Sequence, residues 1–315
     1  EEQIDCDFRR SGKLKLASKP QHMAVIAKNF AALNALVDPE TTLLTRDELK
    51  SEIGSDAFNG AMLQPKSSMM HMGRFVAGLA QATARHGADI FAATPVTACT
   101  PDTTGHRLTT PSGTITARKV LLATGAYTTP NFGWFRRRII PVGSFIVATR
   151  VLTEKEVRKT LPGDRTCVTS LNVGNYFRLS PDRRLIFGGR ARFSARSDQG
   201  SDAKSGKVLQ AAMTNLFPHL ADVGIDYCWG GMVDMTKDRY PRAGQVDGIY
   251  YAMGYSGHGA QLATHLGEIM ADQMRGEKRE NPWTTLPWDA VAGHFGKPWF
   301  LPLVGAYYKM LDKLR

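Results

Sequence analysis

Cysteine is scarce in this sequence, whose 315 residues contain four, at positions 6, 99, 167 and 228. None forms a C-x-x-C pair or has the spacing of a zinc site, which argues against a zinc finger or a disulfide framework. Free thiols of a cytoplasmic protein are the expected alternative. No apolar run approaches about 18 residues, so we predict no integral membrane segment. The eight histidines form no H-x-x-H or H-x-x-x-H pair, and we predict no metal site.

Acidic residues are outnumbered, with 29 Asp and Glu against 40 Lys and Arg and a formal net charge of +11. Such an excess attracts nucleic acid, anionic lipid or an acidic substrate. The basic residues are scattered, however, and none of the usual nucleic-acid-binding motifs is present. We therefore expect a solvated basic surface, a small-molecule substrate and no nucleic-acid partner.

The first ten residues, EEQIDCDFRR, contain neither an initiator methionine nor an apolar signal segment, so we expect further residues upstream. Apolar spacing predicts helices at 21–37 and 71–87. Between them Thr45 and Glu48 have the spacing of a capping box, which predicts a helix start. We assign residues 1–62 to a helical segment on the substrate side of the molecule.

Strand signals follow the second helix. The segment 88–100 is strand-like, and a polar hairpin is predicted over 103–117. The segment ARKVLLATGAY, 117–127, indicates a short buried strand that ends at Gly125. Helix, strand, hairpin and buried strand in this order predict an α/β layer with a β-meander attached.

The pattern changes in the second half of the chain. From 139 to 235 apolar and polar residues alternate between turn signals, which predicts an antiparallel sheet interrupted by one helix near 203–217. Beyond it the chain returns to strand, glycine turn and helix. The predicted fold class is therefore α/β plus α+β. A discontinuous α/β domain (63–138 and 236–280) encloses an antiparallel β domain (139–235), and 281–315 forms a tail.

Glycines precede the clearest amphipathic helix of the sequence. The stretch GYSGHGAQLATHLGEIMADQM, 254–274, contains Gly254, Gly257 and Gly259, and Gly276 is the predicted helix stop. Glycine permits positive φ and lets a ligand approach the backbone with no Cβ in the way. The unpaired N–H groups and the positive dipole end of the helix would then face that ligand. We predict a flat or anionic ligand here, with a plain strand-to-helix turn as the alternative.

Four segments, in this order and spacing, resemble one known family. They are KVLLATGAYT (119–128), RLIFGGRARF (184–193), WGGMVDMTKDRYPRAG (229–244) and the glycine-rich stretch from Gly254. They are similar to the D-amino-acid oxidase superfamily of FAD-dependent amine oxidoreductases, and most of all to its γ-glutamylputrescine oxidase type. The resemblance runs through nearly the whole chain. It implies that the α/β domain binds FAD and that the inserted sheet binds substrate.

The resemblance implies non-covalently bound FAD with its isoalloxazine ring at the glycine-rich stretch. Its backbone N–H groups would stabilise the negative charge of the reduced ring. At the adenine end Val96 is implied, although as a residue it is an ordinary strand valine. Thr124 and Gly125 end the strand beside the flavin, where a simple turn is the alternative. The implied cofactor-binding residues are Val96, Thr124, Gly125, Gly254, Ser256, Gly257, His258, Gly259, Ala260 and Gln261.

The implied reaction is oxidation of the C–N bond of an amine or amino acid, with hydride transfer to flavin N5 and a γ-glutamylated polyamine among the candidate substrates. His258 is the candidate catalytic residue, as a substrate-positioning group or proton acceptor, although a structural histidine is favoured. Arg190 could pair with a substrate carboxylate, or be a surface arginine. Tyr127 and Tyr255 are candidates for walls of the substrate pocket, or ordinary core or rim aromatics.

One motif that the resemblance leads us to expect, G-x-G-x-x-G, is absent from the sequence. The family places this motif, followed by an acidic residue for the ribose, in a first βαβ unit. Two functions therefore stay open. The first is an FAD-dependent amine or amino-acid oxidase or dehydrogenase that is inactive as this chain alone. The second is a cofactor-free fragment or a partner-dependent, non-catalytic subunit of a heteromeric flavoenzyme.

The end of the chain, 298–315, is apolar with basic residues in its last turn. Helical spacing places five apolar residues on one face: Leu303, Tyr307, Met310, Leu311 and Leu314. We expect this face to pack on its own domain. Contact with a membrane surface, or with a second subunit in an oligomer, is the alternative.

Overall fold

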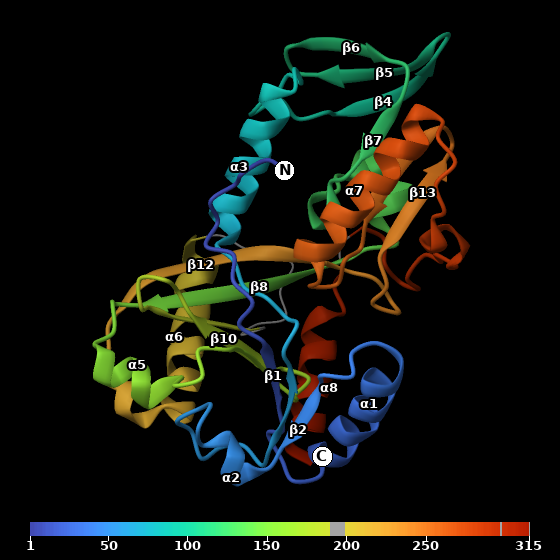
Figure 1. Cartoon of the computed structure of the whole chain (residues 1–315). Coiled ribbons are helices and arrows are strands. Elements are labelled where there is room, and N and C mark those ends of the chain that lie inside the picture. The colour runs from blue at the N-terminus through green and yellow to red at the C-terminus, as the bar shows by residue number, and fades with distance from the viewer. Residues whose placement is uncertain (190–198, 297, 315) are drawn as a thin grey trace.

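The computed structural model of the chain describes residues 1–189, 199–296 and 298–314 (Figure 1). Within these ranges the strands form one large sheet and two smaller ones. The large sheet occupies the lower half of Figure 1, and α3 (Met72–Arg85) runs from it toward the smaller sheets. The predicted mixed α/β class with several sheets is confirmed.

The large sheet has eight strands. They are β1 (Lys13–Leu16), β2 (Thr42–Leu44), β3 (Ala61–Gln64), β8 (Ile140–Thr149), β9 (Thr166–Thr169), β10 (Asn175–Leu179), β11 (Leu185–Gly189) and β12 (Ile225–Met235). Their order across the sheet is β12-β8-β11-β10-β9-β1-β3-β2. Every neighbouring pair is antiparallel except β1 and β9, which run parallel.

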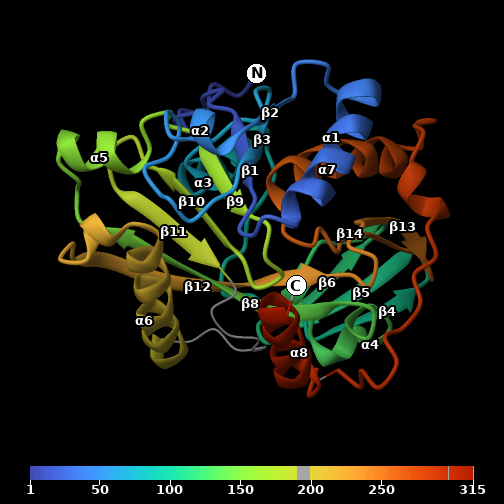
Figure 2. The same ribbon diagram turned by 90° about the horizontal axis from the view of Figure 1, so that it is seen from below.

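One face of this sheet carries the main hydrophobic core. Leu14 and Leu16 of β1 are fully buried in it, and Lys13 and Lys15, which alternate with them, lie on the opposite face. The core is covered by α2 (Arg46–Leu49), α5 (Glu154–Thr160) and α6 (Gln199–Leu216) together with their flanking residues. Figure 2 shows α6 standing against β8, β11 and β12. The opposite face is left free to form a site.

The large sheet differs from the sequence prediction in its extent. We expected an antiparallel sheet confined to 139–235, but β1, β2 and β3 add strands from 13–64. The segment 1–62 is therefore not mainly helical, although α1 (His22–Leu36) matches the helix predicted there. The signal that was overlooked is the alternation KLKL in β1, which has the period of a half-buried strand. The proposed domain limits stay a prediction.

A second sheet joins segments that are distant in the sequence. Its strands are β7 (Val120–Leu122), β13 (Arg242–Val246) and β14 (Ile249–Met253), in the order β13-β14-β7. The strand β14 runs parallel to β7. Helix α7 (Gly259–Arg275) follows β14 and buries Leu266, Ile269 and Met270 against β13 and β14. It ends at Gly276, as predicted, with a left-handed φ of +88°.

The third sheet is the predicted meander of β4 (Ala98–Asp102), β5 (Gly105–Thr110) and β6 (Gly113–Ala117). Helix α3 matches the prediction over 71–87 closely. The strand expected over 88–100 forms only from Ala98, because 88–97 takes irregular conformations. Short helical turns occupy the connection between the second sheet and β8: η1 (Gly125–Tyr127), η2 (Pro130–Phe132) and α4 (Gly133–Arg136).

The tail forms α8 (Leu301–Leu314) after the short turn η4 (Pro282–Thr285), and η3 (Pro218–Leu220) follows α6. The helix was predicted, but its packing face was not. Leu303, Tyr307, Met310 and Leu314 are all at least half exposed, while Leu301 and Gly305 are buried. Asp312 fastens the helix by accepting hydrogen bonds from the backbone of Asn172 and Val173. No helix in the described ranges is long and apolar enough to cross a membrane.

Candidate flavin and substrate site

Residues 254–258, which we call the glycine loop, connect β14 to α7. The backbone has positive φ at Gly254, Ser256 and Gly257. Helix α7 begins after His258, whose side chain makes no capping hydrogen bond. The N–H groups of the first helical turn have no acceptor within the helix. A helix of this length therefore presents open donors and a positive dipole end beside the loop.

Asp234 of β12 holds the glycine loop in place. Its carboxylate accepts a hydrogen bond of 2.6 Å from the Gly254 N–H, and its backbone oxygen accepts one of 3.0 Å from Ser256. A Cβ on Gly125 would lie 3.1 Å from the same carboxylate, so the end of β7 reaches it too. Burial raises the pKa of Asp234. Asp234 was not among the predicted site residues, although a lone carboxylate in the apolar segment GMVDM was an available signal.

Ser256 fixes the shape of the loop from within. Its hydroxyl accepts a hydrogen bond of 3.1 Å from the Thr236 N–H and donates one of 3.3 Å to the Gly254 carbonyl. Space is tight on this side, since a Cβ on Gly254 would lie 2.5 Å from Cγ2 of Thr236. The opposite holds at Gly257, where a Cβ would meet nothing within 4 Å. The loop is therefore packed on one side and open on the other.

The open side faces a cavity of about 610 Å³, which we call the loop cavity. Ser256, Gly257 and His258 line it from the loop. The free face of the large sheet lines it with Lys15, Ser144, Val168 and Tyr176, and the remaining lining includes Val233 and Arg239. The loop cavity thus lies between a helix start and a sheet, which is a common setting for a bound cofactor.

The electrostatics of the loop cavity are positive. Lys15 donates a hydrogen bond of 3.1 Å to the Thr169 carbonyl, and its pKa is lowered by burial, then by Lys13 and Arg239. Arg239 also lines the cavity, and its backbone φ is +67°. The amide dipoles of α7 add to these charges. The arrangement favours a ligand that is anionic or becomes so.

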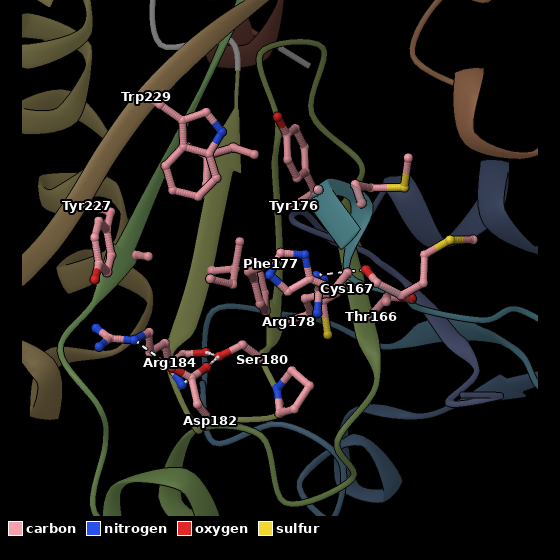
Figure 3. Close-up of a pocket in the computed structure, with 18 of the residues that line it drawn as sticks. Thr166, Cys167, Tyr176, Phe177, Arg178, Ser180, Asp182, Arg184, Tyr227 and Trp229 are labelled. Atoms are coloured by element: carbon pink, nitrogen blue, oxygen red, sulfur yellow. Dashed lines mark hydrogen bonds and ion pairs between the residues drawn. The ribbon is translucent and has the colours of Figure 1, made fainter. Parts of the chain in front are cut away.

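A second cavity of about 800 Å³ adjoins the first on the same sheet face (Figure 3). We call it the arginine cavity, after Arg178 in its wall. Val168 and Tyr176 line both cavities. The Tyr176 ring lies over Gly188, where a Cβ would be 2.3 Å from it, and its hydroxyl shares a hydrogen bond of 2.7 Å with Ser144. Tyr176 therefore lies at the boundary between the arginine cavity and the loop cavity.

Most of the residues predicted for the flavin lie together. Gly254, Ser256, Gly257 and His258 form the loop, and Gly259, Ala260 and Gln261 form the first turn of α7. Thr124 and Gly125 follow β7 closely, and the parallel neighbour of β7, β14, leads directly into the loop. Gly125 approaches Asp234 as described above. His258 is exposed at the edge of the loop cavity.

The other predicted residues lie elsewhere. Val96 is in the segment between α3 and β4. Tyr127 is 67% exposed, and its hydroxyl accepts a hydrogen bond of 3.1 Å from the Met232 N–H. Tyr255 is partly buried, and burial, with the charge of Asp234, raises its pKa to about 12. These three residues line neither cavity. Arg190 falls outside the described residues.

No metal site is apparent in what the structure describes. Within 1–189, 199–296 and 298–314, no group of three or more His, Cys, Asp or Glu residues is placed to hold an ion. The charged side chains that line the loop cavity are the cations Lys15 and Arg239, and hydroxyl and amide groups supply most of its other polar atoms. Such donors suit an organic anion or a polarised ring rather than a cation.

A family model described as FAD dependent oxidoreductase (DAO) matches residues 1–273. The chain therefore belongs to the DAO family of FAD-dependent oxidoreductases. Gamma-glutamylputrescine oxidoreductase of Escherichia coli K12 is 30% identical over 99% of this chain and 73% of its own length. Probable oxidoreductase OrdL of Haemophilus influenzae is 31% identical over 99% of this chain and 72% of its own.

Solved structures agree with this assignment at the level of the fold. Glycine oxidase from Geobacillus kaustophilus superposes with a TM-score of 0.78 at 24% identity, covering 92% of this chain and 76% of that one. L-proline dehydrogenase from P. horikoshii gives a TM-score of 0.74 at 19% identity. The chain therefore shares its fold with both of these structures.

The residues around the glycine loop fit the ring end of FAD. The open N–H groups of α7 are the donors that a polarised carbonyl edge requires, and the space in front of Gly257 is free of protein atoms. The phosphate end has no matching motif, because G-x-G-x-x-G is absent from the sequence. The fit is therefore confined to the flavin ring.

Proposed function

We propose that this chain oxidises the C–N bond of an amine or amino acid as part of an FAD-dependent enzyme. The observation that carries the proposal is the open backbone at Gly257, beside a helix start, facing a cavity under the large sheet. Family membership supports the cofactor, and the relatives' names support an amine or amino acid as substrate. Bound FAD supplies the two-electron acceptor that turns the amine into an imine, which water hydrolyses to a carbonyl compound.

The roles proposed for the chain's own residues follow from their charges and positions. The N–H groups of Gly259, Ala260 and Gln261 would hold a carbonyl edge and stabilise negative charge there. The cations Lys15 and Arg239 would repel an ammonium group, so a neutral amine, which is the form able to lose hydride, is favoured in the cavity. His258 would position the substrate at the cavity edge or accept its proton.

We also propose a division of labour along the chain. The segments 63–138 and 236–280 would hold the cofactor, and the large sheet, with most of its strands in 139–235, would bind the substrate. The parallel pairing of β7 with β14 and the shared contact at Asp234 support a single cofactor-binding unit built from distant segments. The exposed apolar face of α8 is compatible with an oligomer contact.

The substrate class is tested by anaerobic flavin bleaching. The full-length gene product, loaded with FAD, would be mixed with γ-glutamylputrescine, putrescine, sarcosine and D-alanine in turn. We expect loss of the oxidised flavin absorbance with at least one of these amines. Bleaching by none of them, together with bleaching by a 2-hydroxy acid, would contradict amine oxidation.

The absence of a phosphate-binding motif favours one second candidate, a partner-dependent subunit that holds no cofactor. The two candidates differ in a simple observation. A full-length product that is yellow, or becomes so with added FAD, supports the oxidoreductase. A full-length product that stays colourless and binds no added FAD would support the non-catalytic subunit instead.

A further inference from the structure

Two cationic side chains share the free face of the large sheet at the arginine cavity. Lys13 of β1 pairs in register with Thr166 of β9, and Arg178 lies on β10, the strand on the other side of β9. All three residues line the cavity, and Figure 3 shows Arg178 beside Thr166. Both cations are partly buried. We call Lys13 and Arg178 the two-cation site.

Neither cation is in direct contact with a carboxylate within the described residues. Arg178 donates hydrogen bonds of 3.2 Å to the Leu179 carbonyl and 3.1 Å to the Met70 carbonyl, which leaves part of its five N–H donors unused. Over the described ranges, no carboxylate lies within 4.0 Å of Arg178 or of Lys13. Burial lowers the pKa of both groups. Asp164 and Asp7 attract Arg178 from beyond contact distance, but no described carboxylate touches either cation, and a bound anion would relieve the remaining cost of burying two charges.

The carboxylates nearby are already paired. Asp164 forms an ion pair with Arg9. Asp7 is 2.8 Å from a guanidinium nitrogen of Arg74. In the cavity wall Asp182 accepts hydrogen bonds from Ser180 and Arg184, and Arg184 is also bonded to Asp226. Arg184 is therefore neutralised, which distinguishes it from Arg178.

The rest of the arginine cavity suits a hydrocarbon chain. Ile146, Ile186 and Ala148 form its floor on the sheet, and the aromatic rings of Trp229 and Tyr227 stand along one side (Figure 3). The two cavities meet at Val168 and Tyr176, which line both. A molecule that fills both would have one end at the glycine loop and its other end at the two-cation site.

We propose that Arg178, assisted by Lys13, binds the carboxylate of a substrate whose amine reacts at the glycine loop. This inference rests on the proposed function, because it takes the loop cavity as the place of reaction. Arginine binds a carboxylate through two parallel hydrogen bonds, and lysine contributes a point charge. The substrate class is therefore an amine that carries a remote carboxylate.

Sheet geometry sets a lower limit to the separation of amine and carboxylate. Lys13 lies two residues from Lys15, which lines the loop cavity, and two residues of a strand rise about 7 Å. Two extended residues of a peptide chain, roughly six bonds, span that distance. An α-amino acid such as glycine is too short to occupy both ends. An ω-amino acid or an amine acylated with a dicarboxylic acid is long enough.

The test is a comparison of ligands on the purified full-length protein by calorimetry. The probes are 6-aminohexanoate, whose length matches the lower limit, hexylamine, which lacks the carboxylate, and glycine. The variants are Arg178→Gln and Lys13→Met. Matched controls are Arg158→Gln and Lys155→Met on α5, which remove the same charges at exposed positions. Lys13→Met breaks no hydrogen bond, so it remains informative if Arg178→Gln unfolds.

We expect 6-aminohexanoate to bind more tightly than hexylamine or glycine. Arg178→Gln should weaken it about tenfold or more, as expected for loss of a charge-assisted pair. Lys13→Met should weaken it by a smaller factor. Hexylamine binding should change less than about twofold in either variant. Equal binding of 6-aminohexanoate in the wild type and in both folded variants would overturn the two-cation site.

Turnover separates this inference from the proposed function. In the FAD-loaded enzyme, Arg178→Gln should raise KM for 6-aminohexanoate, leave its kcat nearly unchanged and leave KM for hexylamine unchanged. If no amine is oxidised but Arg178-dependent binding persists, the proposed function fails and the anion site stands. If both amines are oxidised with equal KM in wild type and variant, the anion site fails and the function stands.

Discussion

The large sheet differs from helix α3 and strand β7 in how completely its apolar residues are covered. In the large sheet Phe145, Phe187 and Leu185 are wholly buried within one continuous core. On the other side Leu121 of β7 is 37% exposed, and Leu79 of α3 is 36% exposed. Among the described residues of α3 only Ala82 is buried. The core face of the large sheet is therefore closed, whereas α3 and β7 leave apolar side chains partly in water.

This difference matches the work that each region would do. A substrate site needs side chains held on a rigid surface, and the sheet provides Lys13, Arg178 and Tyr176 on strands backed by the core. In the glycine loop, Gly257 and His258 are exposed. Regions with few buried contacts open at lower cost, and a ligand bound there contributes to their stability. We therefore expect matched mutations in the two regions to differ in their effect on stability.

The largest expected effect compares two identical substitutions. Leu185→Ala in the large sheet should lower the free energy of unfolding by about 2–5 kcal/mol, because it leaves a cavity in a closed core. Leu79→Ala on α3 should cost less than about 1 kcal/mol, because that side chain is already partly in water. Urea denaturation of both variants measures this. Equal losses would remove the contrast between the regions.

The next effect concerns the glycine loop itself. Gly254→Ala should cost about 2–4 kcal/mol, because its φ of +81° is strained for alanine and its Cβ would press on Thr236 at 2.5 Å. Gly87→Ala is the matched control, with a φ of +85° and nothing within 4 Å of the new Cβ. It should cost about 1 kcal/mol from strain alone. Similar losses in thermal unfolding would show that Thr236 does not confine the loop.

The smallest expected effect is a pH dependence of the free energy of unfolding. It comes from Glu156 in α5, which covers the core of the large sheet. Arg150, with the Thr153 backbone, lowers the pKa of Glu156 to about 2. Because the folded-state pKa is lowered, the stabilisation by ionised Glu156 is present above about pH 4.5 and is lost as the pH falls toward 2. Glu156→Gln should therefore cost about 1 kcal/mol at pH 7 and flatten this acid limb. An unchanged stability curve would contradict the pairing.

Asp234, at the end of β12 that meets the glycine loop, has a pKa shift of the opposite sign. Its pKa is raised by burial, so its contribution to stability is greatest below the unfolded pKa and falls as the pH rises through the folded value. The carboxylate is nevertheless held at the junction of β7, β12 and the glycine loop. A charge kept there at a cost to stability is consistent with a functional position rather than a purely structural one.

Local signals were enough to predict the helices. Apolar spacing located α1 and α3, and glycine located both ends of α7. Nothing local to β1 indicates that its parallel partner is β9, about 150 residues away, because strand pairing is decided by the whole core. The exposed face of α8 was misjudged for a related reason, since amphipathic spacing does not show what covers a helix.

The site was predictable only in part. Glycine chemistry identified the loop before α7, because positive φ and close approach are properties of the residue itself. Lys13 and Arg178 were not found, since neither belongs to a motif and they meet only when β1 and β10 flank β9. Asp234 was missed for the same reason, because the two segments that it contacts, at Gly125 and Gly254, come together only in the folded chain.

The claim that the glycine loop faces the flavin is tested most directly by FAD titration of two valine variants of the full-length gene product. Gly257 and Gly276 have φ values of +93° and +88°, and a Cβ on either meets no protein atom within 4 Å. They flank opposite ends of α7, so backbone strain is matched. We predict that Gly257→Val loses FAD binding while Gly276→Val retains it. Normal FAD binding by a folded Gly257→Val protein would contradict the account.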